Sequence, residues 1–444
     1  MASTKPSTPP TFTPWDAETH RDPYPQLRAL QEHDPVHRFD LVSGWVVTSH
    51  ADAVRILEDG SFSSRIRTST FEQTRAAPVS PEDGADVPLR SFFERSLLFL
   101  DDPRHASVRR CVAAVFTPGA VARRESRIRQ IVEATVAALP TEREFDFVKE
   151  LAARVPAAVI ADILGVPSSD VDRHLHWSEG IGIFLDIVKS EEQRAHATRC
   201  LGEMWDYFDR ATAAPSSLPE DALMGCLAAL CERSEMTREE MLAMCCLLSA
   251  AGQETTANLL ANAMCALLER PELADRLRQD EPSLPTFVEE VLRTDGPIMG
   301  VPRVATQDVC LRDRQVRAGD YLIVVTAAAN RDPARYDAPD DLTVDGPARP
   351  HLAFGQGRHY CLGAALARAE AVAVLSCCLR QRRFEPARPL AEIRRKPTQV
   401  LRGPAELWVR APVRSAPGAA IDARQGVGGP EMSGSSFTSS DRSR

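Results

Sequence analysis

Long hydrophobic runs are missing from this sequence. The longest apolar stretch extends from Leu242 to Gly252, about half of the roughly 20 residues that a membrane-spanning helix needs. Residues 1–10 read MASTKPSTPP and contain no apolar segment of the kind that a secretory signal peptide carries. We therefore expect a cytoplasmic protein that has no membrane partner.

An excess of basic residues is missing too. The chain has 53 Lys and Arg residues against 62 Asp and Glu residues, which gives a net charge of −9, and only four of the basic residues are lysine. Because nucleic acid binds to basic surfaces, this balance argues against nucleic acid as the main partner.

Cysteine pairs with CxxC spacing are also absent, which weighs against zinc ribbons and thiol redox centres. The 11 cysteines are an odd number, and several lie in apolar, helix-like stretches. This pattern is typical of small buried side chains in a reducing compartment rather than of a disulfide framework.

Apolar residues make up 43% of the 444 positions, enough for a large core. Residues 1–14 are rich in Pro, Ser and Thr and predict a flexible arm, whereas residues 411–444 are rich in Gly, Ser and Ala and predict a disordered tail. Residues 15–410 contain no convincing linker. Within them, residues 75–89 are predicted to form a long loop.

Helical periodicity dominates the middle of the chain. The clearest helix has its N-cap at Thr237, with Glu240 three residues further on, and ends before Pro271. Helices are predicted over residues 118–139, 151–164, 241–269 and 285–293. Strands are predicted over residues 45–48, 321–325 and 405–409. The expected fold class is mainly α with a small β part.

The most distinctive segment is FGQGRHYCLG, residues 354–363, which leads into an Ala- and Leu-rich helix. Its glycines allow turns with positive φ and a close approach of backbone to a flat ligand. Cys361 stands at the start of the helix, where the helix dipole favours the thiolate that binds metals. The plain alternative is a buried cysteine after a glycine-rich turn. A zinc site of His351, His359 and Cys361 is a further alternative, but it lacks an evident fourth ligand.

A second unusual segment, AAGQETT at residues 250–256, lies in the middle of the longest predicted helix. Glycine weakens a helix and threonine hydroxyls bond back to the preceding turn, so a kink or a widened groove is expected. Leucines flank the segment on both sides, which argues against a water-facing helix here. A buried acid, Glu254, beside the hydroxyl of Thr255 suggests a proton relay.

Two pairs of residues have helical spacing. Glu290 and Arg293 form an ExxR pattern that recurs elsewhere in the chain and means little alone, because most such pairs are solvated surface contacts. His105 and Arg109 lie four residues apart on one face of an expected helix, where a solvated basic face is the plain alternative.

In combination, these segments resemble the cytochrome P450 superfamily. Residues 354–363 match the family pattern Phe-Gly-x-Gly-x-His/Arg-x-Cys-x-Gly at every fixed position, and residues 251–255 match Ala/Gly-Gly-x-Asp/Glu-Thr. The motifs stand in the family's order, and the resemblance covers about residues 12–410. It implies the P450 fold, a single large domain that holds haem b between the long central helix and the cysteine-loop helix.

The resemblance implies roles for single residues. Cys361 would be the metal ligand, as the thiolate on the haem iron. Thr255 would hydrogen-bond iron-bound dioxygen or its ordered water, and Glu254 would help to deliver protons for cleavage of the O–O bond. The implied cofactor-binding residues are His105, Arg109, Ala251, Gly252, Arg303, Phe354, Gly355, His359 and Gly363.

Several contacts are expected among these residues. Phe354 would pack beside the cysteine sulfur, and Gly252 would leave room for oxygen above the haem. Arg forks suit carboxylates, and the resemblance also implies that four residues bind the haem propionates. These are His105, Arg109, Arg303 and His359.

In the family, the Glu–Arg pair is structural and is completed by a basic residue in the following segment. Here Glu290 and Arg293 would form the pair. Arg349 and His351 both qualify as its third member, and the sequence does not choose between them. The chain departs from the family at residues 344–346, Val-Asp-Gly, where many bacterial relatives have an Asp-Arg pair.

The substrate pocket is expected to draw on residues 67–99 and 181–187, the long helix and residues 298–301. Its predicted lining residues are Leu247, Ala251, Ile298, Met299 and Val301. Because they are largely apolar, an apolar or amphipathic substrate is favoured over a sugar phosphate, with a secondary metabolite as the expected class.

The expected reaction is oxidation of this small molecule by dioxygen, with electrons from NAD(P)H passed through a ferredoxin reductase and a ferredoxin. A basic surface at Arg104, Arg110, Arg358 and Arg368, the docking arginines, is expected to bind an acidic ferredoxin. One alternative is a haem-thiolate enzyme that couples or dehydrogenates its substrate without inserting oxygen. Another is a non-catalytic haem-binding sensor or carrier. The pair of Glu254 and Thr255 argues against this alternative, because gas binding needs no proton relay.

Overall fold

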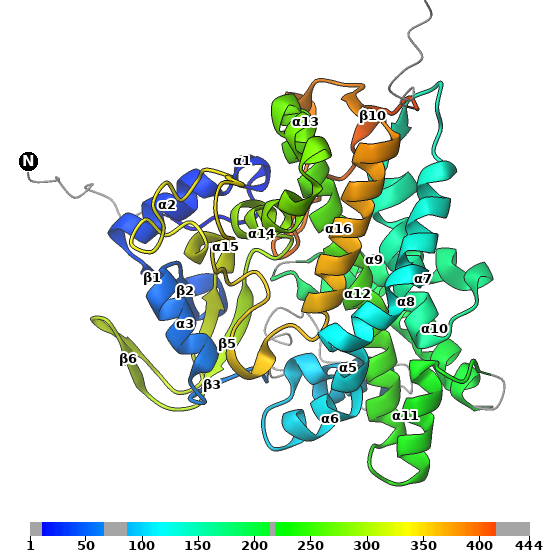
Figure 1. Cartoon of the computed structure of the whole chain (residues 1–444). Helices are drawn as coiled ribbons and strands as arrows, with labels where there is room; N and C mark the ends of the chain where they lie inside the picture. The colour runs from blue at the N-terminus through cyan, green and yellow to red at the C-terminus, as the bar shows by residue number, and fades with distance from the viewer. Residues whose placement is uncertain (1–10, 66–86, 188, 214–217, 414–444) are drawn as a thin grey trace, which may run out of the picture.

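The computed structural model describes residues 11–65, 87–187, 189–213 and 218–413, and most of them are helical. Figure 1 shows two regions: helices fill the larger part on the right, and strands gather with a few short helices on the left. Within the described residues, no helix is both long enough and apolar enough to span a bilayer.

Helix α12 (Arg238–Glu269) forms the centre of the larger region. Its 32 residues correspond to a length of about 48 Å, and it begins with a capping box in which Thr237 and Glu240 exchange hydrogen bonds. Around it pack α5 (Val87–Arg95), α8 (Arg154–Leu164), α9 (Val171–Gly182), α10 (Glu191–Thr212) and α16 (Ala364–Gln381). The apolar side chains of these helices form the main core.

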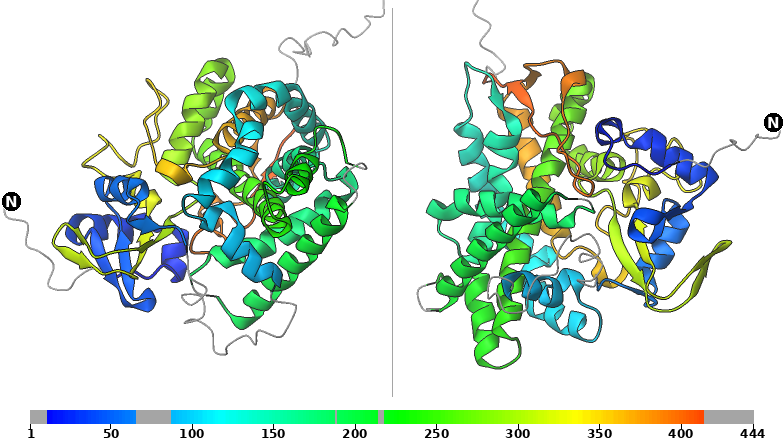
Figure 2. Two further views of the ribbon diagram at one scale, coloured as in Figure 1. Left: turned by 90° about the horizontal axis from the view of Figure 1, so that it is seen from below. Right: turned by 180° about the vertical axis from the view of Figure 1, so that it is seen from behind.

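A five-stranded sheet joins parts of the chain that are distant in sequence. Its strands, in spatial order, are β1 (Val36–Phe39), β2 (Gly44–Val47), β8 (Tyr321–Val324), β5 (Val301–Ala305) and β3 (Phe62–Ser63). β2 and β8 are parallel, with Trp45 opposite Leu322, and the other neighbours are antiparallel. The N-terminal strands and those that follow residue 300 therefore lie side by side (Figures 1 and 2).

The remaining elements cover these two regions. The helices are α1 (Ala17–Arg21), α2 (Tyr24–His33), α3 (His50–Glu58), α6 (Arg104–Ala113), α7 (Pro118–Ala137), α11 (Leu223–Glu232), α13 (Pro271–Gln279), α14 (Leu284–Asp295) and α15 (Thr326–Ala329). The small sheets are a hairpin of β6 (Val309–Leu311) and β7 (Arg314–Val316), and a set ordered β4 (Phe145–Asp146), β10 (Trp408–Arg410), β9 (Glu385–Pro386).

Most of the predicted elements are confirmed. The helices predicted at 118–139, 241–269 and 285–293 correspond to α7, α12 and α14, and the strands predicted at 45–48 and 321–325 correspond to β2 and β8. The helix predicted from residue 151 is α8, which begins at Arg154 after the π-helical turn Val148–Ala152.

Two predictions need correction. The strand predicted at 405–409 is wrong in its first part, because strand partners in β4 and β9 are available only from Trp408 onward. The loop predicted at 75–89 lies largely outside the described residues, and its last part, 87–89, belongs to α5. Pro88 suits the first turn of that helix because no backbone N–H is needed there.

Both ends of the domain extend beyond the predicted limits of 15 and 410. Phe12 is buried with its ring centre 5.2 Å from that of Phe39, and the Thr13 N–H donates to Gln26 at 3.1 Å. Ala411 is buried, and the Arg383 N–H donates to the carbonyl of Pro412 at 3.1 Å. Residues 11–14 and 411–413 thus pack with the domain, and the rest of the predicted arm and tail lies outside the described residues.

Candidate active site

The cysteine loop enters α16 through a tight turn. Gly355 and Gly357 have φ angles of +71° and +69°, and a Cβ on Gly357 would lie 2.7 Å from the carbonyl oxygen of Leu57. After the short helical turn η10 (Gly357–His359), the Cys361 N–H donates to the carbonyl of Phe354 at 2.8 Å. This bond closes the loop and sets Cys361 just before α16.

Cys361 lies where a thiolate can be stabilised. Its thiol is free and accessible, although protein surrounds it on most sides. Burial raises the pKa of the thiol, whereas a hydrogen bond from the Gly363 N–H and the charges of Arg109 and Arg368 lower it. A metal cation bound at the sulfur would shift this balance to the thiolate.

Arg368 of α16 braces the loop. Its guanidinium lies 4.4 Å from the ring centre of Phe354 and binds the carboxylate of Glu289 with two nitrogens, at 2.7 and 2.8 Å. Glu289 also contacts His351 at 3.2 Å. Burial opposes ionisation, but these hydrogen bonds prevail and lower the pKa of Glu289 to about 2. No pattern in the sequence indicated that Glu289 supports the loop.

Three buried nitrogen donors converge beside the loop. The Nε2 atoms of His105, in α6, and of His359 are buried and have no hydrogen-bond partner among the described residues, and the two ring centres are 4.2 Å apart. Arg303 of β5 is also buried, and it donates to the carbonyl of its neighbour Pro302 at 2.7 Å. Burial lowers the pKa of Arg303 to about 10, and burial together with the charge of Arg303 lowers the pKa of His359 to about 3. A carboxylate bound here would satisfy all three groups.

Arg109 reaches the same loop from α6. It lies one turn after His105, as the spacing predicted, and donates to the carbonyl of Tyr360 at 2.8 Å. α6 therefore supplies two of the expected cofactor-binding residues to one side of the cysteine loop.

α12 has an open surface in its middle. Ala251 is exposed although most of the helix is buried, and the Thr255 hydroxyl donates to the Ala251 carbonyl at 2.7 Å, which is the expected back-bond. Gly252 faces α8 and not this open surface, because a Cβ on Gly252 would lie 3.1 Å from Ile160 of α8. The expected role of Gly252 is thus corrected: the glycine lets α8 and α12 pack closely, and the open position is Ala251.

Glu254 is buried on another side of α12. Its Oε1 lies 3.2 Å from the Nζ of Lys396, and a Cβ on Gly182, at the end of α9, would collide with its Oε2. Burial raises the pKa of Glu254, and Lys396 opposes the rise. Sequence reasoning missed Lys396, for which the scarcity of lysine was the only signal.

Comparisons with known proteins decide the family. The family model described as Cytochrome P450 matches residues 211–409, which include α12 and the cysteine loop. Mycinamicin IV hydroxylase/epoxidase of Micromonospora griseorubida is 34% identical over 391 residues, which are 86% of this chain and 93% of the relative. Vitamin D(3) 25-hydroxylase of Pseudonocardia autotrophica is 33% identical over 79% of this chain and 84% of the relative. This chain belongs to the cytochrome P450 family.

The fold of this P450 agrees with that of its relatives. The crystal structure of CalO2 matches with a TM-score of 0.82 at 31% identity, over 90% of this chain and 98% of that structure. Relatives carry the names of hydroxylases and monooxygenases, and this chain is a P450 monooxygenase with a haem cofactor, external redox partners and a small-molecule substrate. The free thiol and the unpartnered buried donors described above fit haem, which offers iron and two carboxylates.

The third member of the Glu290–Arg293 pair in this P450 is Arg349. Arg293 donates to both oxygens of Glu290 at 3.0 Å, and Arg349 donates from Nε to Oε1 at 3.0 Å. Burial opposes ionisation of Glu290, but the hydrogen bonds from Arg349 and Arg293 lower its pKa. His351 binds Glu289 instead.

The zinc alternative finds no support. Across the described ranges, no group of three or more His, Cys, Asp or Glu side chains is placed to hold a metal ion. His351, His359 and Cys361 therefore do not form such a group.

Residues 344–346 are the segment where the chain departs from the family pattern. There Asp345 pairs with Arg276 at 2.7 Å on the surface.

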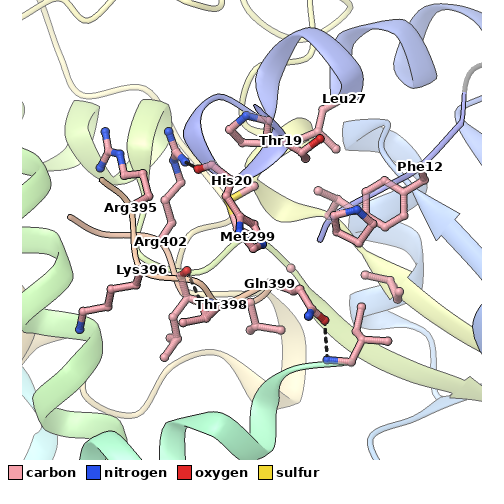
Figure 3. A pocket seen from close by; sticks show the side chains of 18 residues that line it. Phe12, Thr19, His20, Leu27, Met299, Arg395, Lys396, Thr398, Gln399 and Arg402 are labelled. Carbon is pink, nitrogen blue, oxygen red and sulfur yellow. Dashed lines mark hydrogen bonds between the residues drawn. The ribbon is translucent and has the colours of Figure 1, made fainter. Parts of the chain in front are cut away.

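Of the predicted substrate-lining residues, Leu247, Ile298 and Val301 are half-buried and Ala251 is exposed. Met299 lines a small cavity between the N-terminal residues and residues 395–402 (Figure 3). The cavity volume is about 60 Å³, room for about two water molecules. An organic substrate would need this region to open.

The docking arginines have different surroundings. Arg110 is exposed. The other three form ion pairs, which are Arg104 with Glu240, Arg358 with Asp102, and Arg368 with Glu289.

Proposed function

We propose that this P450 inserts one oxygen atom from dioxygen into an apolar or amphipathic secondary metabolite, with haem b as its cofactor. The observation that supports this most lies on α12: the Thr255 hydroxyl bonds the carbonyl of the exposed Ala251, and the next residue before it in the sequence, Glu254, is a buried acid. A buried acid beside a hydroxyl serves proton transfer, which a sensor or carrier of gas does not need.

The cofactor would be held by residues from four segments. Cys361 is the proposed thiolate ligand of the iron, in a loop shaped by Phe354, Gly355 and Gly363. The proposed propionate ligands are His105, Arg109, Arg303 and His359. Ala251 is the proposed contact from α12. Haem supplies the oxygen-activating chemistry when it is bound, and a thiolate ligand favours that chemistry.

Two residues of α12, Thr255 and Glu254, would transfer protons. The Thr255 hydroxyl would give up its bond to the Ala251 carbonyl and orient dioxygen or an ordered water. Glu254 would hold a proton at a carboxyl oxygen and pass it toward Thr255. Burial of Glu254 supports this role, because it raises the pKa of the carboxyl and so favours the protonated form that can donate a proton.

The substrate would lie against Leu247, Ala251, Ile298, Met299 and Val301. Their apolar character supports an apolar or amphipathic compound. The names of two relatives, a mycinamicin IV hydroxylase/epoxidase and a vitamin D(3) 25-hydroxylase, support the same class.

Electrons would come from NAD(P)H through a ferredoxin reductase and a ferredoxin. Arg110 and Arg358 are the exposed members of the proposed docking surface, and Arg110 is the one of the two that has no ion pair among the described residues. Exchange of Arg110 for Glu should slow reduction by an acidic ferredoxin, and an unchanged rate would count against this surface. The cytoplasmic location stays a prediction.

The reduced carbon monoxide difference spectrum tests the site. We expect a thiolate-type band, and a histidine-type band would overturn the assignment of Cys361. Screening of small molecules for a change in haem spin state would identify a substrate. Isotopically labelled dioxygen then tests the reaction: label in the product supports oxygen insertion, and an unlabelled coupled or dehydrogenated product would support the alternative enzyme.

A further inference from the structure

The acid Glu254 lies where three parts of the chain meet. Its Oε1 contacts Lys396, which belongs to the loop that precedes β10. Its Oε2 lies against Gly182, the last residue of α9. The side chain of Leu401 lies 3.4 Å from the position of a Cβ on Gly182, so it closes the same junction. Glu254 is therefore enclosed by α12, the end of α9 and the loop 396–401.

The loop 396–401 is tied to the turn that follows α9. The N–H groups of Gln399 and Val400 donate to the Asp186 carboxylate at 2.8 and 3.3 Å. In return, the Ile187 N–H donates to the Gln399 side chain at 3.0 Å (Figure 3). The turn and the loop both border the small cavity, whereas Lys396 turns its ammonium away from the cavity toward Glu254 (Figure 3).

We propose that Lys396 is a positioning residue for Glu254, held in place by the turn at 183–187 through the loop 396–401. While turn and loop are joined, the ammonium of Lys396 keeps the Glu254 carboxylate charged. When the turn leaves the loop, the carboxyl is free to take up a proton. Opening of the cavity and protonation of the acid are thereby linked. The inference rests on the proposed function, in which Glu254 supplies protons.

The charges around Glu254 support this link. Burial raises the pKa of Glu254, and so do Glu179 of α9 and Asp186 near the end of the turn. Lys396, from the loop, lowers it by its charge and its hydrogen bond. Without Lys396 the remaining influences all favour the neutral acid.

The test follows the protonation of Glu254 directly. Infrared difference spectra of the holoenzyme are recorded over a range of pH, and the C=O band of protonated Glu254 is assigned by its absence in Glu254→Gln. The variants are Lys396→Met, Lys396→Arg and Asp186→Ala. Gln399→Ala serves as a second loop variant if Asp186→Ala does not fold. Lys149→Met is the matched control, because Lys149 is exposed.

In Lys396→Met, the pH at which the band appears should rise by about 1 to 3 units, because a cation at this distance lowers a carboxyl pKa by that amount. Lys396→Arg and Lys149→Met should leave it unchanged. Asp186→Ala should also shift it upward. Loss of the Asp186 charge alone would shift it downward, so an upward shift reports the loosened loop.

The outcomes separate the parts of the inference. No shift in Lys396→Met would overturn the role of Lys396. A shift in Lys396→Met without an upward shift in Asp186→Ala or Gln399→Ala would overturn the link to the turn. The proposed function fails by a different result, namely unchanged product yield per NAD(P)H in Glu254→Gln.

Discussion

Arg349 and Glu290, 59 positions apart in the sequence, form the ion pair that completes a buried cluster with Arg293. Arg293 also donates to the backbone carbonyls of Asn330, Pro339 and Asp341. The cluster fastens α14 to the segment that leads into the cysteine loop. The placement of Cys361 therefore depends on it.

Loss of Arg293 should destabilise the protein strongly. Arg293→Met would leave the carboxylate of Glu290, which is 1% exposed, without one of its two arginine partners. Breaking a buried pair costs about 3–5 kcal/mol, which urea unfolding followed by circular dichroism would measure. Arg276→Met, which removes the surface pair with Asp345, is the control and should change little. Equal losses in the two variants would contradict a structural role for the buried cluster.

Stability should decrease in acid partly through Glu289. Its folded-state pKa of about 2 lies below the unfolded value of about 4.3, so the stabilisation is complete above the unfolded value. It is lost as the pH falls from about 4.3 toward 2, because the unfolded state then binds the extra proton. Urea unfolding at a series of pH values should show a shallower decrease for Glu289→Gln. The same pH dependence in both proteins would argue against the ion pairs with Arg368 and His351.

Gly357 should tolerate no side chain. Gly357→Ala puts an L residue at φ +69° and a Cβ 2.7 Å from the Leu57 carbonyl oxygen. Gly346→Ala is the matched control, since Gly346 has φ +88° but open space around it. Backbone strain should lower the free energy of unfolding by about 1–3 kcal/mol in both variants, with a further loss in Gly357→Ala alone. Thermal unfolding and haem content measure this, and equal effects would exclude the steric contribution.

Arg303 should lower the stability of the haem-free protein and raise its affinity for haem. Arg303→Leu removes a buried charge whose hydrogen bond goes only to the neighbouring Pro302 carbonyl in the described structure, so the haem-free protein should gain about 1–3 kcal/mol. The same change should weaken haem binding, because a propionate loses a charged partner. Urea unfolding and haem titration give the two values. A fall in both would show that Arg303 stabilises the fold instead.

The Thr255 hydroxyl should govern how efficiently electrons yield product. Thr255→Ala should lower product formed per NAD(P)H about tenfold, the effect of one lost hydrogen bond of about 1.4 kcal/mol. Thr255→Ser keeps the hydroxyl and should retain most of the yield. The measurement needs a substrate from the spin-state screen. An unchanged yield in Thr255→Ala would rule out the proposed proton relay.

The sequence alone determined the features that depend on local spacing. The turn glycines, Cys361 and the start of α16 lie within one segment, so the cysteine loop could be recognised from its order of residues. The capping box of Thr237 and Glu240 and the shared helical face of His105 and Arg109 are also local. Helix geometry fixes such neighbours without reference to the rest of the chain.

Only the tertiary structure decided which distant side chains meet. Arg349 rather than His351 reaches Glu290, Lys396 reaches Glu254 across 142 positions, and Gly252 faces Ile160. Each of these contacts depends on how whole helices and loops pack, and a pattern of spacing along one segment does not encode that packing. The charge of a buried carboxyl such as Glu254 depends on the same packing, because burial and distant partners set its pKa together.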